Sequence, residues 1–166
     1  MTIDQISAAD TYDLRRRILR AGDSDAVVEW VGDDEDSTFH LGIRDRSGAV
    51  VAISTWLHRP DPSDPAAKST QLRGMATEPD QAGSGLGSRL LAAGTERCRS
   101  RGDTVIWANA RVTAIGFYER AGFSVVGAVF ETADTGLPHQ MVRLTLPRDV
   151  DGADQAGFPS VAPITP

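Results

Sequence analysis

The stretch EPDQAGSGLGSRLLAAGTERCRSRG runs from Glu78 to Gly102 and places three glycines within five residues, directly before a long amphipathic pattern. The segment TQLRGMAT (residues 70–77) directly before it is predicted to be a strand, so the glycines lie in a strand-to-helix turn. Backbone amides at a helix start are unpaired and favour an anion, and glycines leave room for a phosphate to approach them. Gly83, Gly85 and Gly87 are therefore predicted to form a cradle for a pyrophosphate.

The glycines alone fit this anion cradle and an ordinary tight turn about equally well. Two other kinds of nucleotide site do not fit the pattern. No Gly-Lys-Ser/Thr follows, as a P-loop requires, and the spacing differs from the G-x-G-x-x-G of a dinucleotide-binding fold. The sequence around the turn has to decide between the two interpretations.

Outward from the turn, helical and strand patterns alternate. A capping box of Ser7 and Asp10 predicts a first helix that ends at Gly22. Strands are predicted over residues 38–44, 49–57, 70–77, 103–110, 123–131 and 139–146, and a short helix over 113–122. This order predicts one α/β (α+β) domain over residues 1–148, with a central mixed, mostly antiparallel twisted sheet flanked by helices. Residues 149–166, rich in Pro, Gly and Asp, are predicted to be a flexible tail.

The composition is that of a globular protein. The 166 residues, 40% hydrophobic and 24% charged, suffice for one core. A net charge of −6 argues against nucleic acid as a partner and is compatible with a cationic substrate such as an amine. The first residues lack a signal-peptide pattern, and no apolar run is long enough to cross a membrane. With a single cysteine, Cys98, nothing implies an oxidising compartment, so we expect a cytoplasmic protein without membrane partners.

Several motifs in a fixed order give the chain a family resemblance. LRGMATEPDQAGSGLGSRLL, then VIWANAR, then AIGFYERAGF resembles the GNAT superfamily of N-acetyltransferases over about residues 5–146. The resemblance implies that the glycine turn binds the pyrophosphate of acetyl-CoA and that the preceding strand binds the pantetheine arm through its main chain. Shorter strings, including LRRRILR, TFHLG and GLPHQM, resemble the YjcF-like bacterial branch, whose members mostly have no assigned substrate.

The resemblance assigns cofactor-binding positions to particular residues. They are Met75, Ala76 and Thr77 of the strand, Gly83, Ser84, Gly85, Leu86, Gly87 and Ser88 of the turn, and Asn109 after the next strand. One departure from the family pattern is Ala82, which stands where the turn usually begins with Arg or Gln. We expect one weakened phosphate contact there, for which Arg89 is a candidate to compensate.

The resemblance also implies a catalytic tyrosine, whereas the base is open. Tyr118 matches the family tyrosine that protonates or hydrogen-bonds the departing sulfur; by its pattern alone it would be a core aromatic residue. Glu78 lies just past the cofactor strand and His139 opens the last strand, where the ordinary titration of histidine near neutral pH suits a base. Each also fits a structural role, as a turn residue and a strand end. Glu131, at the end of the preceding strand, is a third candidate.

The remaining residues of interest are possible acceptor contacts, the single cysteine and the three histidines. Arg73, Arg111 and His40 are candidates to line the acceptor side, or are strand charges that face water. Cys98 lies in the body of the long helix, which favours a buried residue over an acyl carrier. The three histidines lack metal-ligand spacing, so no metal is predicted.

The predicted function is direct transfer of an acetyl group from acetyl-CoA to a primary amine, of a small molecule or of a protein. The alternative is a CoA-binding sensor or interaction module without turnover. The three tryptophans fit a core, a pocket or an interface, so a homodimer is open as well.

Overall fold

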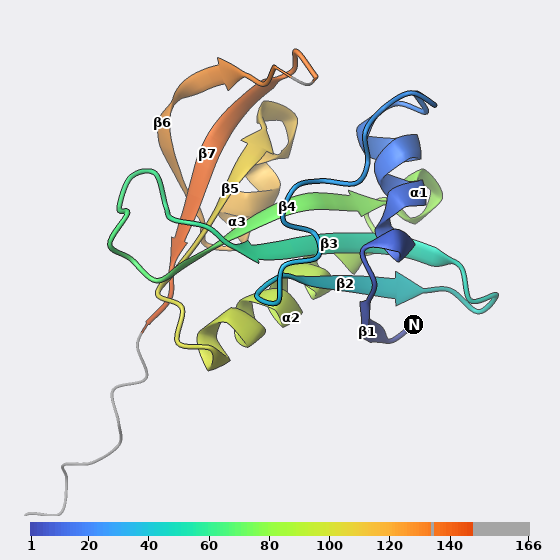
Figure 1. The fold of residues 1–166 in the computed structure, drawn as a ribbon, viewed down its shortest axis with the longest axis horizontal. Helices are drawn as coiled ribbons and strands as arrows, with labels where there is room; N and C mark the ends of the chain where they lie inside the picture. Colours follow the sequence, from blue (N-terminus) through green and yellow to red (C-terminus); the bar gives the residue numbers. More distant parts are fainter. Residues whose placement is uncertain (134, 148–166) are drawn as a thin grey trace, which may run out of the picture.

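The computed structural model describes residues 1–133 and 135–147 and contains one seven-stranded mixed sheet in the order β1-β2-β3-β4-β5-β7-β6 (Figure 1). Neighbouring strands run antiparallel except β4 and β5, which are parallel. The predicted fold class is therefore confirmed, while the predicted tail at 149–166 lies outside the described residues. The strands are β1 (Ile3–Ile6), β2 (Phe39–Arg44), β3 (Val50–His58), β4 (Ser69–Thr77), β5 (Val105–Arg111), β6 (Ser124–Glu131) and β7 (Pro138–Thr145).

The two faces of the sheet are covered by different helices. Helix α2 (Leu86–Ser100) buries Leu86, Leu90 and Leu91 in one core cluster, together with Trp56 of β3 and residues of β4, β5 and β7. The helical segment before β2 packs on the other face, where Leu14 joins a cluster of residues from β1, β3 and β4. Figure 1 shows this segment in front of the sheet, with α2 behind and below it. A shorter helix, α3 (Ile115–Arg120), follows β5.

The first helical segment differs from the single helix predicted over 7–22. It consists of a 3-10 turn η1 (Ala9–Thr11), one turn of α-helix α1 (Tyr12–Leu14) and a π-helical turn η2 (Arg15–Leu19), and β1 precedes it. The capping box is present, because the Asp10 amide donates to Ser7 Oγ (3.2 Å) and the Ser7 amide donates to Asp10 Oδ2 (3.0 Å). The segment closes where predicted, at Gly22, whose φ is 80°.

Strands β4 and β5 pair only over their first residues. The ladder runs from Ser69 opposite Val105 to Gln71 opposite Trp107 and goes no further. On its other side, β4 carries one residue more than β3 between two successive pairs, and Gly74 within this bulge has a φ of 60°. A positive φ is readily adopted by glycine, so the sequence permits the bulge here. The second half of β4 therefore diverges from β5 and leaves main-chain groups on that edge without a strand partner.

Candidate active site

A cleft of about 770 Å³ opens where β4 and β5 separate. Residues 72–77 of β4 and 109–111 of β5 line it, together with Tyr118 of α3. Residues 18–20, Val27 and residues 29–31 form another part of its wall, and further lining residues are Thr113, Ala114, Thr132, Thr135 and His139. The cleft thus joins an open strand edge to side chains from several other segments.

Several residues that the sequence assigned to the cofactor meet in this cleft. Met75, Ala76, Thr77 and Asn109 all line it, and the first three come from the edge of β4 that has lost its strand partner. An extended ligand arm laid along that edge would find free backbone donors and acceptors, as an added strand would. The structure therefore fits the main-chain role that the resemblance implied for β4.

After β4 the chain makes the short 3-10 turn η3 (Pro79–Gln81) and then enters the glycine turn, which leads into α2. Gly83 and Gly85 have φ values of 78° and 82°, and a Cβ atom added at either would meet nothing within 4 Å. Gly85 caps α2, whose first helical bond runs from the Arg89 amide to the Gly85 carbonyl (3.0 Å). The amides of residues 86–88 therefore lack helical partners. Open space beside unpaired amides fits a pyrophosphate group.

Tyr118 presents a protonated phenol to the cleft. Its side chain is 7% exposed and packs edge-to-face against Phe117 and Phe123, with ring centroids 5.1 and 5.3 Å away. Burial raises the pKa of Tyr118 to about 12. Within the described part of the chain, no group hydrogen-bonds to its hydroxyl, which leaves that O–H available to a ligand.

The two candidate bases have different surroundings. His139 lines the cleft, and its Nδ1 lies 2.8 Å from the carbonyl oxygen of Leu137. A carbonyl only accepts, so Nδ1 carries the proton and Nε2 of the neutral ring holds a lone pair. Glu78 is not among the lining residues and is held at both carboxylate oxygens by Arg17, at 2.5 and 3.0 Å. Glu131 ends β6, exposed and also outside the lining.

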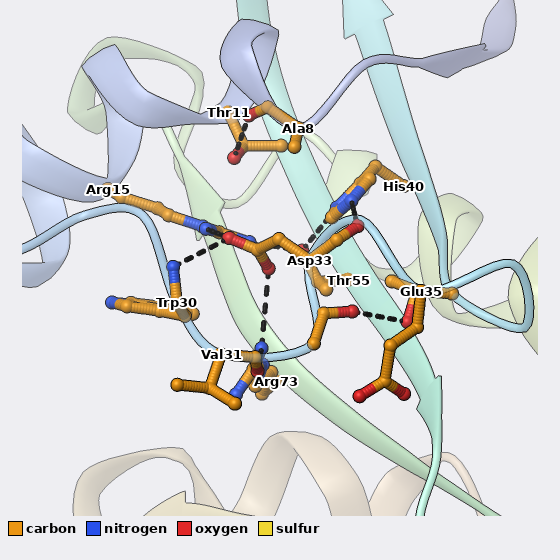
Figure 2. A network of polar contacts seen from close by, with 12 residues as sticks. Ala8, Thr11, Arg15, Trp30, Val31, Asp33, Glu35, His40, Thr55 and Arg73 are labelled. Atoms are coloured by element: carbon orange, nitrogen blue, oxygen red, sulfur yellow. Dashed lines mark hydrogen bonds and ion pairs between the residues drawn. The ribbon is translucent and has the colours of Figure 1, made fainter.

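A buried polar network that sequence reasoning missed supports the wall formed by residues 29–31 (Figure 2). Asp33 accepts from Arg15 at 2.5 and 3.0 Å and from the Trp30 amide at 2.8 Å. Arg73, which lines the cleft, donates through Nη2 to the Val31 carbonyl (2.7 Å) and to Asp33 (3.3 Å). The network fixes the loop before β2 onto β4.

Charge and burial compete at Asp33. Desolvation alone would raise the pKa of this buried carboxyl. The hydrogen bonds from Arg15 and the Trp30 amide, with the charges of Arg15 and Arg73, outweigh that effect and hold the pKa below its ordinary value. Asp33 therefore remains ionised at neutral pH.

The other residues considered from the sequence lie in or away from the cleft. Arg73 and Arg111 line it, whereas His40 is 4% exposed outside the lining and contacts Thr55 Oγ1 (2.9 Å) and the Asp33 carbonyl (3.0 Å). Cys98 is buried in α2, and burial raises its pKa to about 12, so it remains a thiol. Among residues 1–133 and 135–147, no cluster of three His, Cys, Asp or Glu could hold a metal, and no helix there is long and apolar enough to span a membrane.

Solved structures share this fold. A protein of Lactobacillus plantarum superposes with a TM-score of 0.71 at 23% identity, over 88% of this chain and 99% of that one. An aminoglycoside 6'-N-acetyltransferase, solved in complex with coenzyme A, gives a TM-score of 0.70 at 17% identity, over 89% and 99% of the two chains.

Sequence comparison extends the similarity beyond the fold. The acetyltransferase (GNAT) family profile matches residues 8–123. YitI of Bacillus subtilis (strain 168), an uncharacterized N-acetyltransferase, is 29% identical over 136 residues, which cover 82% of this chain and 91% of YitI. The narrower resemblance to the YjcF-like branch stays a prediction. A profile match over most of the chain, on this fold and around this cleft, shows that the chain belongs to the acetyltransferase (GNAT) family, as an acyltransferase that depends on acetyl-CoA.

Proposed function

We propose that the protein transfers the acetyl group of acetyl-CoA directly to a primary amine. One observation carries this proposal: the unpaired edge of β4, Tyr118 and His139 all line the same cleft. Bound acetyl-CoA supplies an activated acyl thioester. The residues around it need only hold two reactants together and move one proton, for which positioning supplies much of the rate.

The main chain of Met75, Ala76 and Thr77 binds and orients the extended arm of the cosubstrate in this proposal. An N–H group on this edge also polarises the acyl carbonyl, because a fixed donor in a sheltered cleft stabilises developing negative charge. The glycine turn, Gly83 to Ser88, holds the pyrophosphate through the unpaired amides of residues 86–88, and Asn109 lies across the cleft on β5. The carboxamide of Asn109 adds a polar contact from that side.

Tyr118 acts on the leaving sulfur. With a pKa of about 12, its phenol is protonated throughout the physiological range and is a weak acid. Full proton transfer to a thiolate, whose conjugate acid has a pKa of about 8.5, is uphill for such a group. We therefore assign Tyr118 a hydrogen bond to the sulfur as the carbon–sulfur bond breaks.

His139 is the base that the geometry favours. Its Nε2 lone pair can take the proton that the amine gives up, while the bond from Nδ1 to the Leu137 carbonyl keeps the ring in the required tautomer. Glu78 stays the second candidate, because its pairing with Arg17 must loosen before it can accept a proton.

The alternative function is a CoA-binding module without turnover. Ala82 in the phosphate turn and the engaged carboxylate of Glu78 are the two features that favour it. Both readings predict cosubstrate binding, so a change at Tyr118 has to separate them.

The discriminating experiment replaces Tyr118 with Phe and follows thiol release from acetyl-CoA over a panel of amines. We expect kcat to fall about 100-fold, because removing one hydrogen-bond donor to developing negative charge costs roughly 10²–10³-fold. The Kd for acetyl-CoA should stay within a factor of about three, since the ring and its packing remain. Wild-type protein that binds acetyl-CoA but acetylates no amine would support the binding module instead.

The same assay tests the base. His139→Gln should lower kcat about 100-fold, and Glu78→Gln should change kcat little. The reverse result would assign the base to Glu78 and leave His139 a structural residue.

The predicted cytoplasmic location and homodimer stay proposals. Exposed Val125, Val129 and Phe130 on β6, at the edge of the sheet, favour self-association. A mass measured by light scattering during gel filtration would test the dimer.

A further inference from the structure

Among the described residues that line the cleft, positive charge exceeds negative charge. Arg20, Arg73 and Arg111 line it, and Glu29 is the carboxylate that does so. Asp34 and Glu35 belong to the same loop as Glu29 but are exposed and lie outside the lining. A polycationic acceptor would be repelled by this lining, whereas an acceptor with an anionic group would be attracted.

Part of the excess positive charge lies beneath the cleft, where one carboxylate, that of Asp33, pairs with the guanidinium groups of both Arg15 and Arg73. The side chains of Arg15 and Asp33 are fully buried and that of Arg73 is 24% exposed, so this set carries a net charge of +1 with little access to water. Nε of Arg15 and Nε of Arg73 are both buried without a hydrogen-bond partner. Burying an uncompensated charge costs free energy, and this set of three side chains lacks one negative charge.

Arg73 is the member of the set that reaches the cleft, and it is held in place there. Its Nη2 makes both hydrogen bonds, to the Val31 carbonyl and to Asp33, while Nη1 bonds to no group in the described part of the chain. The guanidinium carbon lies 5.3 Å from the centroid of the Trp30 ring. A guanidinium fixed in this way is preorganised for an anion, because its side-chain entropy is already lost.

We propose that the acceptor is a small amine that also carries a carboxylate, and that Arg73 binds this carboxylate. The proposal rests on the acetyl-transfer function above and adds the chemical class of the acceptor. The wall near Arg73 also contains apolar side chains, Ile18, Leu19, Val27 and Val31. These favour an amino acid with an apolar side chain over a polar one.

The first test compares amines that differ only in the carboxylate. L-leucine is paired with 3-methylbutylamine, and L-phenylalanine with 2-phenylethylamine, in the thiol-release assay. We expect kcat/KM to be about 10- to 100-fold higher for the amino acid of each pair, the range expected of one charge-assisted hydrogen bond. Equal values, or a preference for the decarboxylated amine, would overturn the proposal.

Substitutions at position 73 test whether Arg73 causes the preference for the amino acid. Arg73→Gln should remove the preference for the amino acid while turnover of the decarboxylated amine continues, and Arg73→Lys should restore part of the preference. The matched control is Arg59→Gln, because Arg59 pairs with Glu35 and lies outside the cleft lining. This control should keep the full preference.

A binding measurement makes the proposal independent of turnover. N-acetyl-L-leucine and N-acetyl-L-leucinamide, each titrated into the protein with and without CoA, differ only at the carboxylate. We expect the acid to bind about 10-fold more tightly, and Arg73→Gln to abolish the difference. If acetyl-CoA binds and either amine turns over but the carboxylate confers no advantage, this inference fails and the proposed function stands. If acetyl-CoA does not bind, the proposed function fails, and the acid–amide comparison still decides whether Arg73 binds carboxylates.

Discussion

At the scale of single residues, Gly94 of α2 lies against the indole ring of Trp56 of β3. A Cβ atom added at Gly94 would lie 2.0 Å from the indole ring. Trp56 is fully buried, stacks on Phe39 and donates to Ser54 Oγ, so the ring has no free space into which to move. The absent side chain therefore sets the distance between α2 and the sheet.

Gly94→Ala should destabilise the protein although alanine favours helix. The gain in helix propensity is about 1 kcal/mol, and overpacking of a filled core costs about 1–3 kcal/mol or more. We expect a net loss of at least about 1 kcal/mol in urea unfolding. The control is Gly116→Ala in α3, where the added atom meets only the tip of Arg120 at 3.4 Å. This control should be neutral or stabilising; a stabilised Gly94→Ala would mean that the helix lies further from the sheet.

Residue types indicated part of the candidate site directly. Met75, Ala76, Thr77, Asn109 and Tyr118 were assigned from motifs, and the structure places all of them at the cleft. Asp33 could not be singled out, because it stands in an acidic run, VGDDEDST, whose neighbouring carboxylates are exposed. No local feature of the sequence distinguishes Asp33, which pairs with Arg15 in the interior, from its exposed acidic neighbours.

At the scale of elements, the bulge in β4 builds the cleft and was not predictable from the strand pattern. The strand predicted over residues 70–77 is present, but its sequence carried no sign of an extra residue. Gly74 is required there for two reasons, a φ of 60° and a Trp30 ring that lies 2.8 Å from the position of a Cβ atom. The second reason depends on a tertiary contact with a loop more than 40 residues away along the chain.

The Arg15–Asp33 pair should make stability depend on pH in the acid range. The folded-state pKa of Asp33 lies below its ordinary value of 3.8, so the unfolded chain takes up this proton at a higher pH than the folded chain. The stabilising contribution is complete well above pH 3.8 and is lost as the pH falls through the lowered folded-state pKa.

Asp33→Asn should remove this contribution. Near pH 7 it should cost about 3–5 kcal/mol, the usual effect of leaving one buried charge unpaired, and the gap to wild type should narrow toward pH 3. Urea unfolding at several pH values measures the gap. Asp34→Asn, at an exposed neighbour, should change stability by less than about 0.5 kcal/mol. A gap that stays constant with pH would contradict the assigned ionisation of Asp33.

At the scale of the whole molecule, net charge and local charge point in opposite directions. The chain carries −6 overall, which is compatible with a cationic substrate, whereas among the described residues that line the cleft arginines outnumber carboxylates. Composition averages over the surface, and only the fold brings Arg73 of β4 and Arg111 of β5 to one cleft. The fold class itself was predictable, because strand and helix periodicities and the order of the motifs extend along the chain.

Acetyl-CoA should stabilise the whole molecule by mass action. At about 100 times its Kd, a ligand that binds only the folded state adds about 2.7 kcal/mol. For a domain of this size the melting temperature should rise by roughly 5–10 °C. CoA should give a similar shift and ADP a smaller one, because the β4 edge binds the arm that ADP lacks. No shift with millimolar acetyl-CoA would mean that the turn with Ala82 does not bind pyrophosphate.

The loop that carries Asp33 has a consequence for anyone who would redesign this enzyme. Val27 and Val31 are 70% and 87% exposed and line the cleft, so a mutant library can vary both without disturbing the core. Trp30 and Asp33, between and beside them, anchor the loop to β4 and must be kept. A new acceptor preference can then be selected by varying a few exposed positions while the anchoring residues are kept. A small library covers all combinations at those positions.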